Sequence, residues 1–168
     1  MSSCILQPSA EVKHLGVTFD SQLTMSSHIR NICQSSFFHL WRIGKVRRFL
    51  DPLTTKCLVQ SLVLSRVDYA CSLFVGLPGT LLSKLHRMMN ASARLILRVR
   101  KSDSTRSHLC SLNWLCVNDR ITFRITTLTY RCLNCSAPSY LFRLIIPLKN
   151  SRSLRSASRS SYSPCKFW

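Results

Sequence analysis

The spacing of the apolar residues constrains this fold more than any other feature of the sequence. From Thr24 onward, apolar side chains recur every three or four positions, which is the period of one face of an α-helix. The clearest run consists of Leu81, Leu82, Leu85, Met88, Met89, Ala93, Leu95, Ile96 and Val99. The pattern predicts a mostly α protein and, over this run, a long amphipathic helix that ends near Arg100.

A first helix is expected to begin at Ser26 or Ser27. A serine side chain at this position can accept a hydrogen bond from the free N–H groups of the first helical turn. The apolar positions that would face the core are Ile29, Ile32, Cys33, Phe37, Leu40 and Trp41.

A second helix has a stronger start signal in Asp51 and Pro52. Aspartate suits the N-cap, and proline suits the first helical position because no N–H is needed there. We expect this helix to end near Arg66. Its inward-facing residues should include Cys57, Leu58, Leu62 and Val63.

Polar and glycine- or proline-containing stretches separate the later helices. Residues 76–79, Gly-Leu-Pro-Gly, break the chain before the long amphipathic run. Residues 102–107 form a polar connection that a short helix should follow. A further long helix is predicted over residues 117–133, and a last short one over residues 140–146.

The two ends of the chain have a different character. Apolar residues at 4–6 and 12–19 flank a proline-containing turn, which predicts a β-hairpin within residues 1–23, with Gly16 interrupting the second strand as at a bulge or a close backbone approach. The helical region should occupy residues 24–147. Residues 148–168 are rich in serine and arginine and hold no acid, which predicts a basic disordered tail.

The charge balance points to a polyanionic partner. The chain has 24 lysines and arginines against six acids, a net charge of +18. Such an excess destabilises a compact chain by self-repulsion unless an anion offsets it. Nucleic acid is the commonest partner of this kind, and an anionic membrane surface is the second. No small-molecule substrate is indicated.

Cysteine usage and hydropathy favour an intracellular protein, nuclear or cytoplasmic and not secreted. The nine cysteines follow no recognisable secretory signal, so we interpret them as reduced. The best candidate for a membrane span, residues 57–82, is interrupted by Arg66 and Asp68. No membrane span is therefore expected.

Neither a metal site nor a cofactor site is expected. Cys132 and Cys135 have the spacing of half a zinc site, and His108, Cys110 and Cys116 are the residues that would have to complete it. No second matched pair exists, so the prediction is no metal and no cofactor. A catalytic cysteine paired with a histidine has no motif to support it. Trp114 and the pair Asp68-Tyr69 are interpreted as packing residues.

Three groups of cations are candidate nucleic-acid-binding residues. Arg42, Lys45, Arg47 and Arg48 lie beside Trp41, and a second group consists of Arg94, Arg98, Arg100 and Lys101. Cations next to an aromatic ring suit phosphate and base contacts. The alternative is a solvated helix end, where cations also favour the helix dipole. The tail cations Arg152, Arg155 and Arg159 either bind nucleic acid or remain solvated.

Several short motifs, taken together and in order, resemble one family. They are Val12-Lys-His-Leu-Gly-Val-Thr-Phe-Asp20, Phe37-Phe-His-Leu40, Leu64-Ser-Arg-Val-Asp-Tyr69, Gly76-Leu-Pro78, Met89-Asn-Ala-Ser-Ala-Arg94, Leu112-Asn-Trp-Leu115, Arg120-Ile-Thr-Phe123, Ala137-Pro-Ser-Tyr-Leu141 and Arg152-Ser-Leu-Arg-Ser156. Over residues 12–156 the chain resembles the C-terminal, thumb-side part of LINE-type (non-LTR) retrotransposon reverse transcriptases. It departs from the family pattern at Asn113, usually histidine, and at Cys116, usually proline.

The resemblance implies a role in holding a template–primer duplex. Residues 12–19 would correspond to the palm-edge hairpin that bears the primer grip, which makes Lys13 and Gly16 candidate contacts. The following helices would correspond to the thumb. The family's paired catalytic aspartates belong to a palm that should precede residue 12, and no two acids are adjacent here, so we expect no polymerase activity.

Three functional hypotheses follow from these observations. The chain is a truncated reverse transcriptase that retains non-specific binding of RNA–DNA or duplex nucleic acid, without the missing fingers and palm. Alternatively, it is a non-functional remnant of a decayed retroelement, with apolar surface left exposed. A weaker alternative is a basic protein that adheres to anionic membranes.

Overall fold

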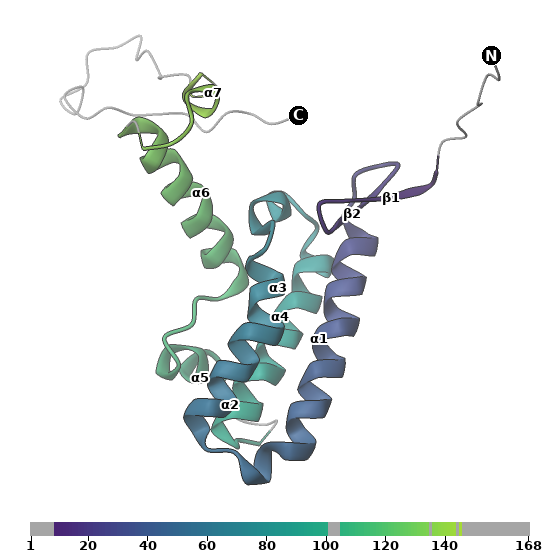
Figure 1. Ribbon diagram of the computed structural model, residues 1–168, viewed down its shortest axis with the longest axis vertical. Coiled ribbons are helices and arrows are strands. Elements are labelled where there is room, and N and C mark those ends of the chain that lie inside the picture. The colour runs from purple at the N-terminus through teal and green to yellow at the C-terminus, as the bar shows by residue number, and fades with distance from the viewer. Residues whose placement is uncertain (1–8, 101–104, 135, 144, 146–168) are drawn as a thin grey trace. The chain divides into compact units, whose positions relative to one another are not determined.

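The computed structural model describes residues 9–100, 105–134, 136–143 and 145. It is mostly α, with a two-stranded antiparallel hairpin followed by helices, as predicted (Figure 1). The elements are β1 (Glu11–His14), β2 (Val17–Asp20), α1 (Ser26–Val46), η1 (Arg47–Phe49), α2 (Pro52–Val59), η2 (Gln60–Leu64), α3 (Ser65–Asp68), η3 (Cys71–Phe74), α4 (Gly79–Leu97), α5 (Thr105–Ser111), α6 (Val117–Leu133) and α7 (Ser139–Phe142). The chain forms two compact units, Met1–Ile121 and Thr122–Trp168.

The hairpin corrects the expectation of one strand over residues 12–19. Strands β1 and β2 pair antiparallel with His14 opposite Val17, and Leu15 and Gly16 form the turn between them. Their φ angles are 47° and 82°. Positive φ at both central positions is the geometry of a type I′ hairpin turn, which matches the twist of the flanking strands. Gly16 therefore marks a turn and not a bulge. Residues 4–6, the expected first strand, lie outside the described residues.

Helix α1 begins where it was expected but is not capped by a serine. The N-cap residue is Met25, whose backbone is left-handed with φ 59°. The Asp20 carboxylate accepts the Met25 N–H at 3.0 Å and the Thr24 N–H at 3.1 Å. Hydrogen bonding, above all from the Thr24 hydroxyl, lowers the pKa of Asp20. The end of β2 thus supplies the acceptor that stabilises the start of α1, and Ser26 and Ser27 lie within the helix.

The start of α2 confirms the Asp51-Pro52 signal. The Asp51 carboxylate accepts the N–H groups of Leu53 and Thr54, both at 3.1 Å, and Pro52 occupies the first helical position. These hydrogen bonds lower the pKa of Asp51. The cap therefore satisfies donors that α2 would otherwise leave free.

The inward face of the second helix differs from the prediction because the helix contains a π turn. Cys57 and Leu62 are exposed, whereas Val59, Val63 and Val67 are fully buried. Steps of four residues drift by about 40° each around an α-helix of 3.6 residues per turn. The wider π turn η2 absorbs this drift between α2 and α3 and keeps the three valines on one line.

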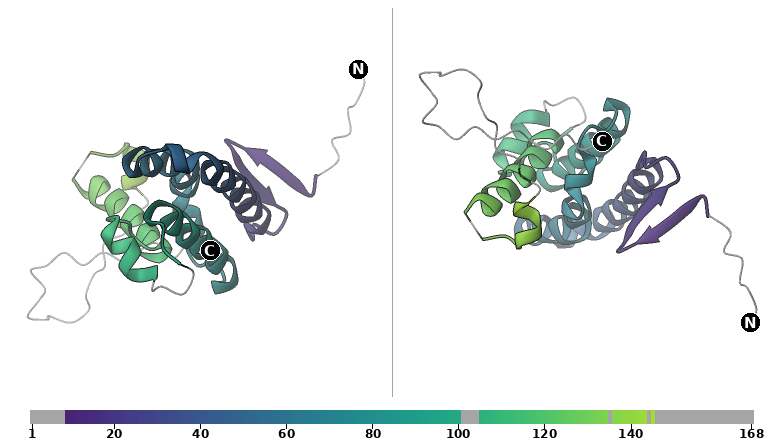
Figure 2. Two further views of the ribbon diagram at one scale, coloured as in Figure 1. Left: turned by 90° about the horizontal axis from the view of Figure 1, so that it is seen from below. Right: turned by 90° about the horizontal axis from the view of Figure 1, so that it is seen from above.

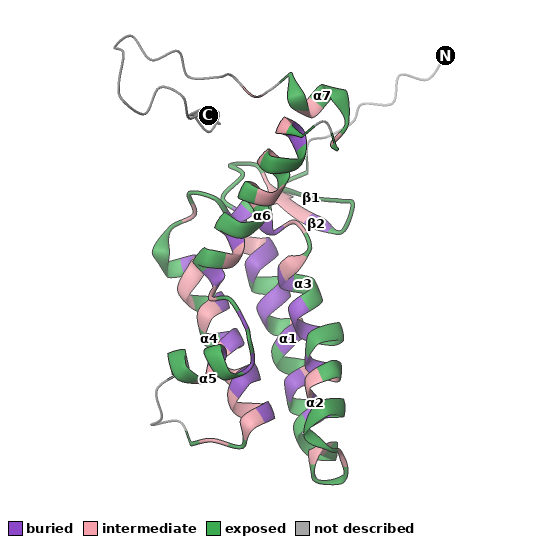
Figure 3. Cartoon of the chain, turned by 90° about the vertical axis from the view of Figure 1, so that its left-hand side faces the viewer, coloured by how far each residue is buried: buried purple, intermediate pink, exposed green. Residues whose placement is uncertain are grey.

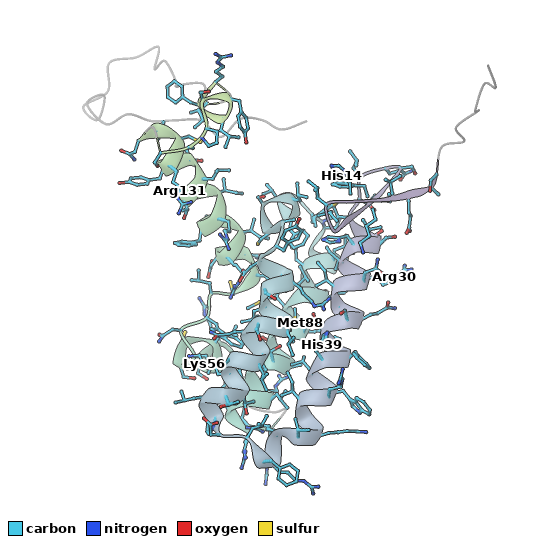
Figure 4. All side chains as sticks on the ribbon, viewed as in Figure 1. His14, Arg30, His39, Lys56, Met88 and Arg131 are labelled. Atoms are coloured by element: carbon cyan, nitrogen blue, oxygen red, sulfur yellow. The ribbon has the colours of Figure 1, made fainter. Side chains whose placement is uncertain are left out.

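The core of the first unit lies between α1, the α2–α3 rod and α4. Helices α1 and α4 run in the same direction, and the α2–α3 rod runs back alongside them (Figures 1 and 2). Buried residues gather on the facing sides of these helices (Figure 3). Met88 is one of them and lies inside the bundle (Figure 4). Among the described residues, the apolar side chains with no exposed surface are Ile29, Val59, Val63, Val67, Phe74, Leu85, Met88, Ala93 and Val117.

The remaining helices largely follow their predicted bounds. Helix α6 spans the 17 residues predicted for it. Helix α5 begins at Thr105, inside the stretch expected to be a polar connection, and α7 ends at Phe142, earlier than expected. Helix α4 ends at Leu97 rather than near Arg100, because Arg98 adopts a left-handed conformation with φ 57° that an α-helix cannot continue. Among the described residues, no helix is both long and apolar enough to cross a membrane.

Of the three residues interpreted as packing residues, Trp114 is buried and Asp68 is half-buried, whereas Tyr69 is 53% exposed, which corrects the interpretation for that residue. The Asp68 carboxylate at the end of α3 accepts a hydrogen bond from the Arg120 guanidinium at 2.6 Å. Both partners of this ion pair are partly shielded from solvent, which makes it stronger than a pair on the open surface. It joins the start of α6 to α3 within the first unit.

His28 connects the hairpin to the helices. It is buried, its Nδ1 accepts the Thr18 N–H at 3.4 Å, and its ring centroid lies 6.1 Å from that of Phe74. Burial lowers the pKa of His28. The neutral imidazole is therefore the form that fits the folded state.

Acidification should destabilise the first unit through His28. A histidine whose pKa is lower in the folded state contributes stability above its unfolded value of 6.5, and this stability is lost as the pH falls through the folded value. We expect the urea midpoint to fall between about pH 7.5 and about pH 5.5. His28→Gln, which cannot titrate, should show a smaller fall. An equal fall in both proteins would assign the effect to other groups.

Candidate nucleic-acid interface

The structure brings together two basic clusters that are far apart in the sequence. One follows the last turns of α1 and the adjoining η1, and the other lies at the end of α4. The Arg47 Nη2 atom donates a hydrogen bond to the Ile96 carbonyl oxygen at 2.6 Å, across 49 positions of sequence. A Cβ atom placed on Gly44 would lie 3.7 Å from Leu95 Cδ1, so the two helices also meet closely here.

We call this region the basic end. Its members are Arg42, Lys45, Arg47, Arg48, Arg94, Arg98 and Arg100. Burial lowers the pKa of the Arg47 guanidinium, and the positive charge of the neighbouring Arg98 lowers it further. Like charges held close together repel one another and favour a bound anion. Arg47 also satisfies a carbonyl near the end of α4, so part of its role is structural.

The described acids lie in several different elements. Asp51 is the nearest in sequence to the basic end, and its carboxylate caps α2. Asp20 accepts hydrogen bonds at the start of α1, and Asp68 pairs with the start of α6. Glu11 lies in the hairpin and Asp119 in the first turn of α6. The hydrogen bonds of Asp51, Asp20 and Asp68 thus involve groups other than the cations of the basic end.

Exposed aromatic rings accompany the cations. Lys45 Nζ lies 3.7 Å from the centroid of the Trp41 ring, and the Arg42 guanidinium lies 5.6 Å from that of Phe38. The Arg48 guanidinium lies 4.6 Å from the centroid of Phe49. These distances are typical of cation–π contacts.

Of these rings, only Trp41 was expected from the sequence to belong to the candidate site. The sequence pattern placed Trp41 beside the first basic cluster and did not indicate Phe38 or Phe49. It also placed Trp41 and Phe37 on the core face of the first helix, which is wrong, because both are exposed. The sequence did contain a signal for these ring–cation pairs. Phe38 and Arg42 are four residues apart, as are Trp41 and Lys45, and such pairs meet on a helix surface.

The hairpin candidates lie at the other end of the bundle. Lys13 is exposed on β1 and Gly16 lies in the turn, whereas the basic end follows α1, whose 21 residues extend for about 30 Å. The close neighbour of Gly16 is Tyr69, whose Cε1 would lie 3.6 Å from an added Cβ. The Tyr69 hydroxyl also donates to the Leu15 carbonyl. The structure therefore does not bring Lys13 and Gly16 to the basic end.

The cations of the second cluster differ in their exposure. Arg98 and Arg100 are exposed, and Arg94 is half-buried on α4. Because Arg98 leaves the helix, it does not continue the helical face of Arg94 as its four-residue spacing suggested. Lys101 and the tail residues Arg152, Arg155 and Arg159 lie outside the described residues.

The cysteines and histidines of the described segments do not assemble a metal centre. Within residues 9–100, 105–134, 136–143 and 145, no group of three or more histidine, cysteine, aspartate or glutamate side chains could hold a metal ion. Cys132 is buried in α6, and Cys135 lies outside the described residues. Cys116 Sγ lies 3.0 Å from Asp119 Oδ2, which is a local contact in the first turn of α6.

The cations of the basic end can bind anions, and exposed aromatic rings lie beside them. Guanidinium and ammonium groups contact phosphates without reading a sequence, and exposed rings suit contact with bases. A comparison of the chain with protein-family models, curated proteins and solved structures found no match in any of the three.

Proposed function

We propose that this protein binds nucleic acid without sequence preference through the basic end. The observation that carries the proposal is the convergence of the α1 and α4 clusters, joined by the hydrogen bond from Arg47 to Ile96. Cations gathered on stiff helices can contact successive phosphates of an RNA–DNA or other duplex. The net charge of +18 favours the same partner and adds long-range attraction.

We further propose that the chain is the thumb-side part of a LINE-type reverse transcriptase. The support is the ordered set of motifs over residues 12–156, together with a fold in which a hairpin precedes a mostly helical region. In this proposal the chain binds a template–primer duplex and leaves polymerisation to the fingers and palm of the parent enzyme, which carry the catalytic aspartates.

Binding should weaken steeply as salt rises. If six cations each contact a phosphate, the affinity for a duplex should fall about a thousandfold between about 50 and 200 mM salt, because bound counterions are released on association. Filter binding or fluorescence anisotropy with a labelled RNA–DNA duplex measures this directly. Equal weak retention at both salt concentrations would contradict the proposal.

The second candidate is a remnant of a decayed retroelement with no activity of its own. Exposed apolar residues in the hairpin and its connection to α1 favour it, among them Val12, Leu15 and Leu23. Such residues indicate a surface that once had a partner. A thermal melt followed by circular dichroism, together with a dye that binds apolar surface, separates the two. A non-cooperative melt with strong dye binding and no oligonucleotide binding would support the remnant.

A further inference from the structure

Helix α1 carries a strip of aromatic and cationic residues on the face opposite its core-facing side. We call Phe38, Trp41, Arg42 and Lys45 the aromatic strip. Their spacing of three and four residues places them on one face of the helix. The buried residues of α1 occupy the other face: His28, Ile29, Ile32, Cys33, Ser36, Leu40 and Ile43. Arg30, one of the exposed cations nearer the start of α1, points away from the bundle in Figure 4.

The packing of the first unit does not use these rings. Phe38 is 54% exposed and Trp41 is 58% exposed, whereas Ile29 and Ser36 on the opposite face have no exposed surface. Large aromatic side chains contribute most to stability when they are buried. Two of them side by side in solvent contribute little to this fold, so their presence calls for a role in binding.

The rings and the cations form one surface. The Phe38 and Trp41 rings lie 6.5 Å apart between centroids with an angle of 26° between their planes, which is a stacked arrangement. Lys45 lies against the indole at 3.7 Å, and Arg42 lies over Phe38. Each ring therefore has a positive charge beside it. A ligand that offers a flat ring next to an anionic group would match both features.

Resting on the proposed function, we propose that the aromatic strip stacks one or two unpaired bases of a single-stranded nucleic acid while Arg42 and Lys45 contact the adjoining phosphates. Base–aromatic stacking tolerates any sequence, because every base has a flat face. In a duplex these faces are covered by neighbouring base pairs, so an exposed ring adds little there. The strip would thus bind a single strand where it leaves the duplex, while the neighbouring basic end contacts phosphates.

Charge favours this occupant over an apolar partner. The strip holds two cations and no acid, and Arg48 and Arg98 belong to the adjoining basic end. A neutral protein groove would leave the ring-bound cations without an anion. An anionic membrane would satisfy charge and rings alike, and the experiment below separates it from nucleic acid.

The test compares a single strand with an abasic strand of the same length, which keeps the phosphates and removes the bases. Fluorescence anisotropy at low salt should show that the full chain binds oligo(dT) about tenfold more tightly than the abasic strand. The double variant Phe38→Leu, Trp41→Leu should lose this preference and keep its affinity for the abasic strand. The single variant Trp41→Phe, which keeps an aromatic ring at both positions, should keep part of the preference. Phe123→Leu, at an exposed phenylalanine of α6, is the matched control and should behave as the unmodified chain.

The outcomes distinguish this inference from the function on which it rests. Equal affinity for the two strands, together with salt-dependent binding, would overturn the stacking role and leave phosphate binding intact. Failure to bind any oligonucleotide would overturn both. If the double variant lost binding to anionic vesicles and kept its preference for oligo(dT), the strip would be a membrane contact and the inference would be wrong. Circular dichroism of each variant confirms that the helices are retained.

Discussion

Replacing Phe74 with alanine is expected to lower the free energy of unfolding by about 4 kcal/mol. Phe74 is the largest fully buried side chain in the described part of the chain, and it lies in η3 against the ring of His28. The substitution removes its buried surface and leaves a cavity beside His28 of α1. Rigid helices cannot collapse to fill such a cavity. Urea denaturation followed by circular dichroism measures the change.

An exposed phenylalanine of the same unit is the control. Phe49 is 75% exposed, so Phe49→Ala should change the free energy of unfolding by no more than about 0.5 kcal/mol. Similar small effects of the two substitutions would mean that Phe74 is not part of a packed core. Phe74→Leu, which keeps most of the apolar volume, should cost less than Phe74→Ala.

Replacing Arg42, Lys45 and Arg48 together with glutamine is expected to reduce the affinity for an RNA–DNA duplex about a hundredfold in low salt. All three are exposed, and none is needed by the core. A plot of the logarithm of affinity against the logarithm of salt concentration should also become less steep. Each lost phosphate contact reduces the magnitude of its slope by about one, so the triple variant should reduce it by about three. Anisotropy titrations at several salt concentrations give both quantities.

A matched variant separates local contacts from net charge. Arg30, Lys84 and Arg87 are also exposed and also comprise two arginines and one lysine, but they lie on α1 and α4 away from the basic end. Replacing them with glutamine removes the same charge and should reduce the slope and the affinity much less. If both triple variants lost affinity equally, binding would depend on overall charge, and the basic end would not be the site.

Much of the candidate site could be predicted as separate pieces. The two basic clusters are visible in the sequence because each lies within a few residues at the end of a predicted helix. That they meet could not be predicted, because the contact between Arg47 and Ile96 spans 49 positions. Only the parallel packing of α1 and α4, which depends on the shapes of many buried side chains, brings them together.

The exposure of Phe37 and Trp41 is a second feature that the sequence pattern did not predict. Phe37 and Trp41 follow the three- and four-residue spacing that is typical of core-facing residues in a helix. The pattern of apolar residues by itself therefore assigns them to the core face. The structure instead buries His28 and Ser36, two polar residues that the apolar period passes over. The width of the buried stripe depends on which neighbouring helices cover α1, and a single-helix pattern does not contain that information.

The sequence by itself determined the mostly α architecture, the start of α2 and the bounds of α6, because helical period, N-caps and breaks act over a few neighbouring residues. Tertiary packing decided the rest: the π turn that aligns Val59, Val63 and Val67, the hairpin end that caps α1 through Asp20, and the meeting of the two basic clusters. These features depend on contacts between segments distant in sequence. Their free energies arise only when the segments pack together, so local patterns do not reveal them.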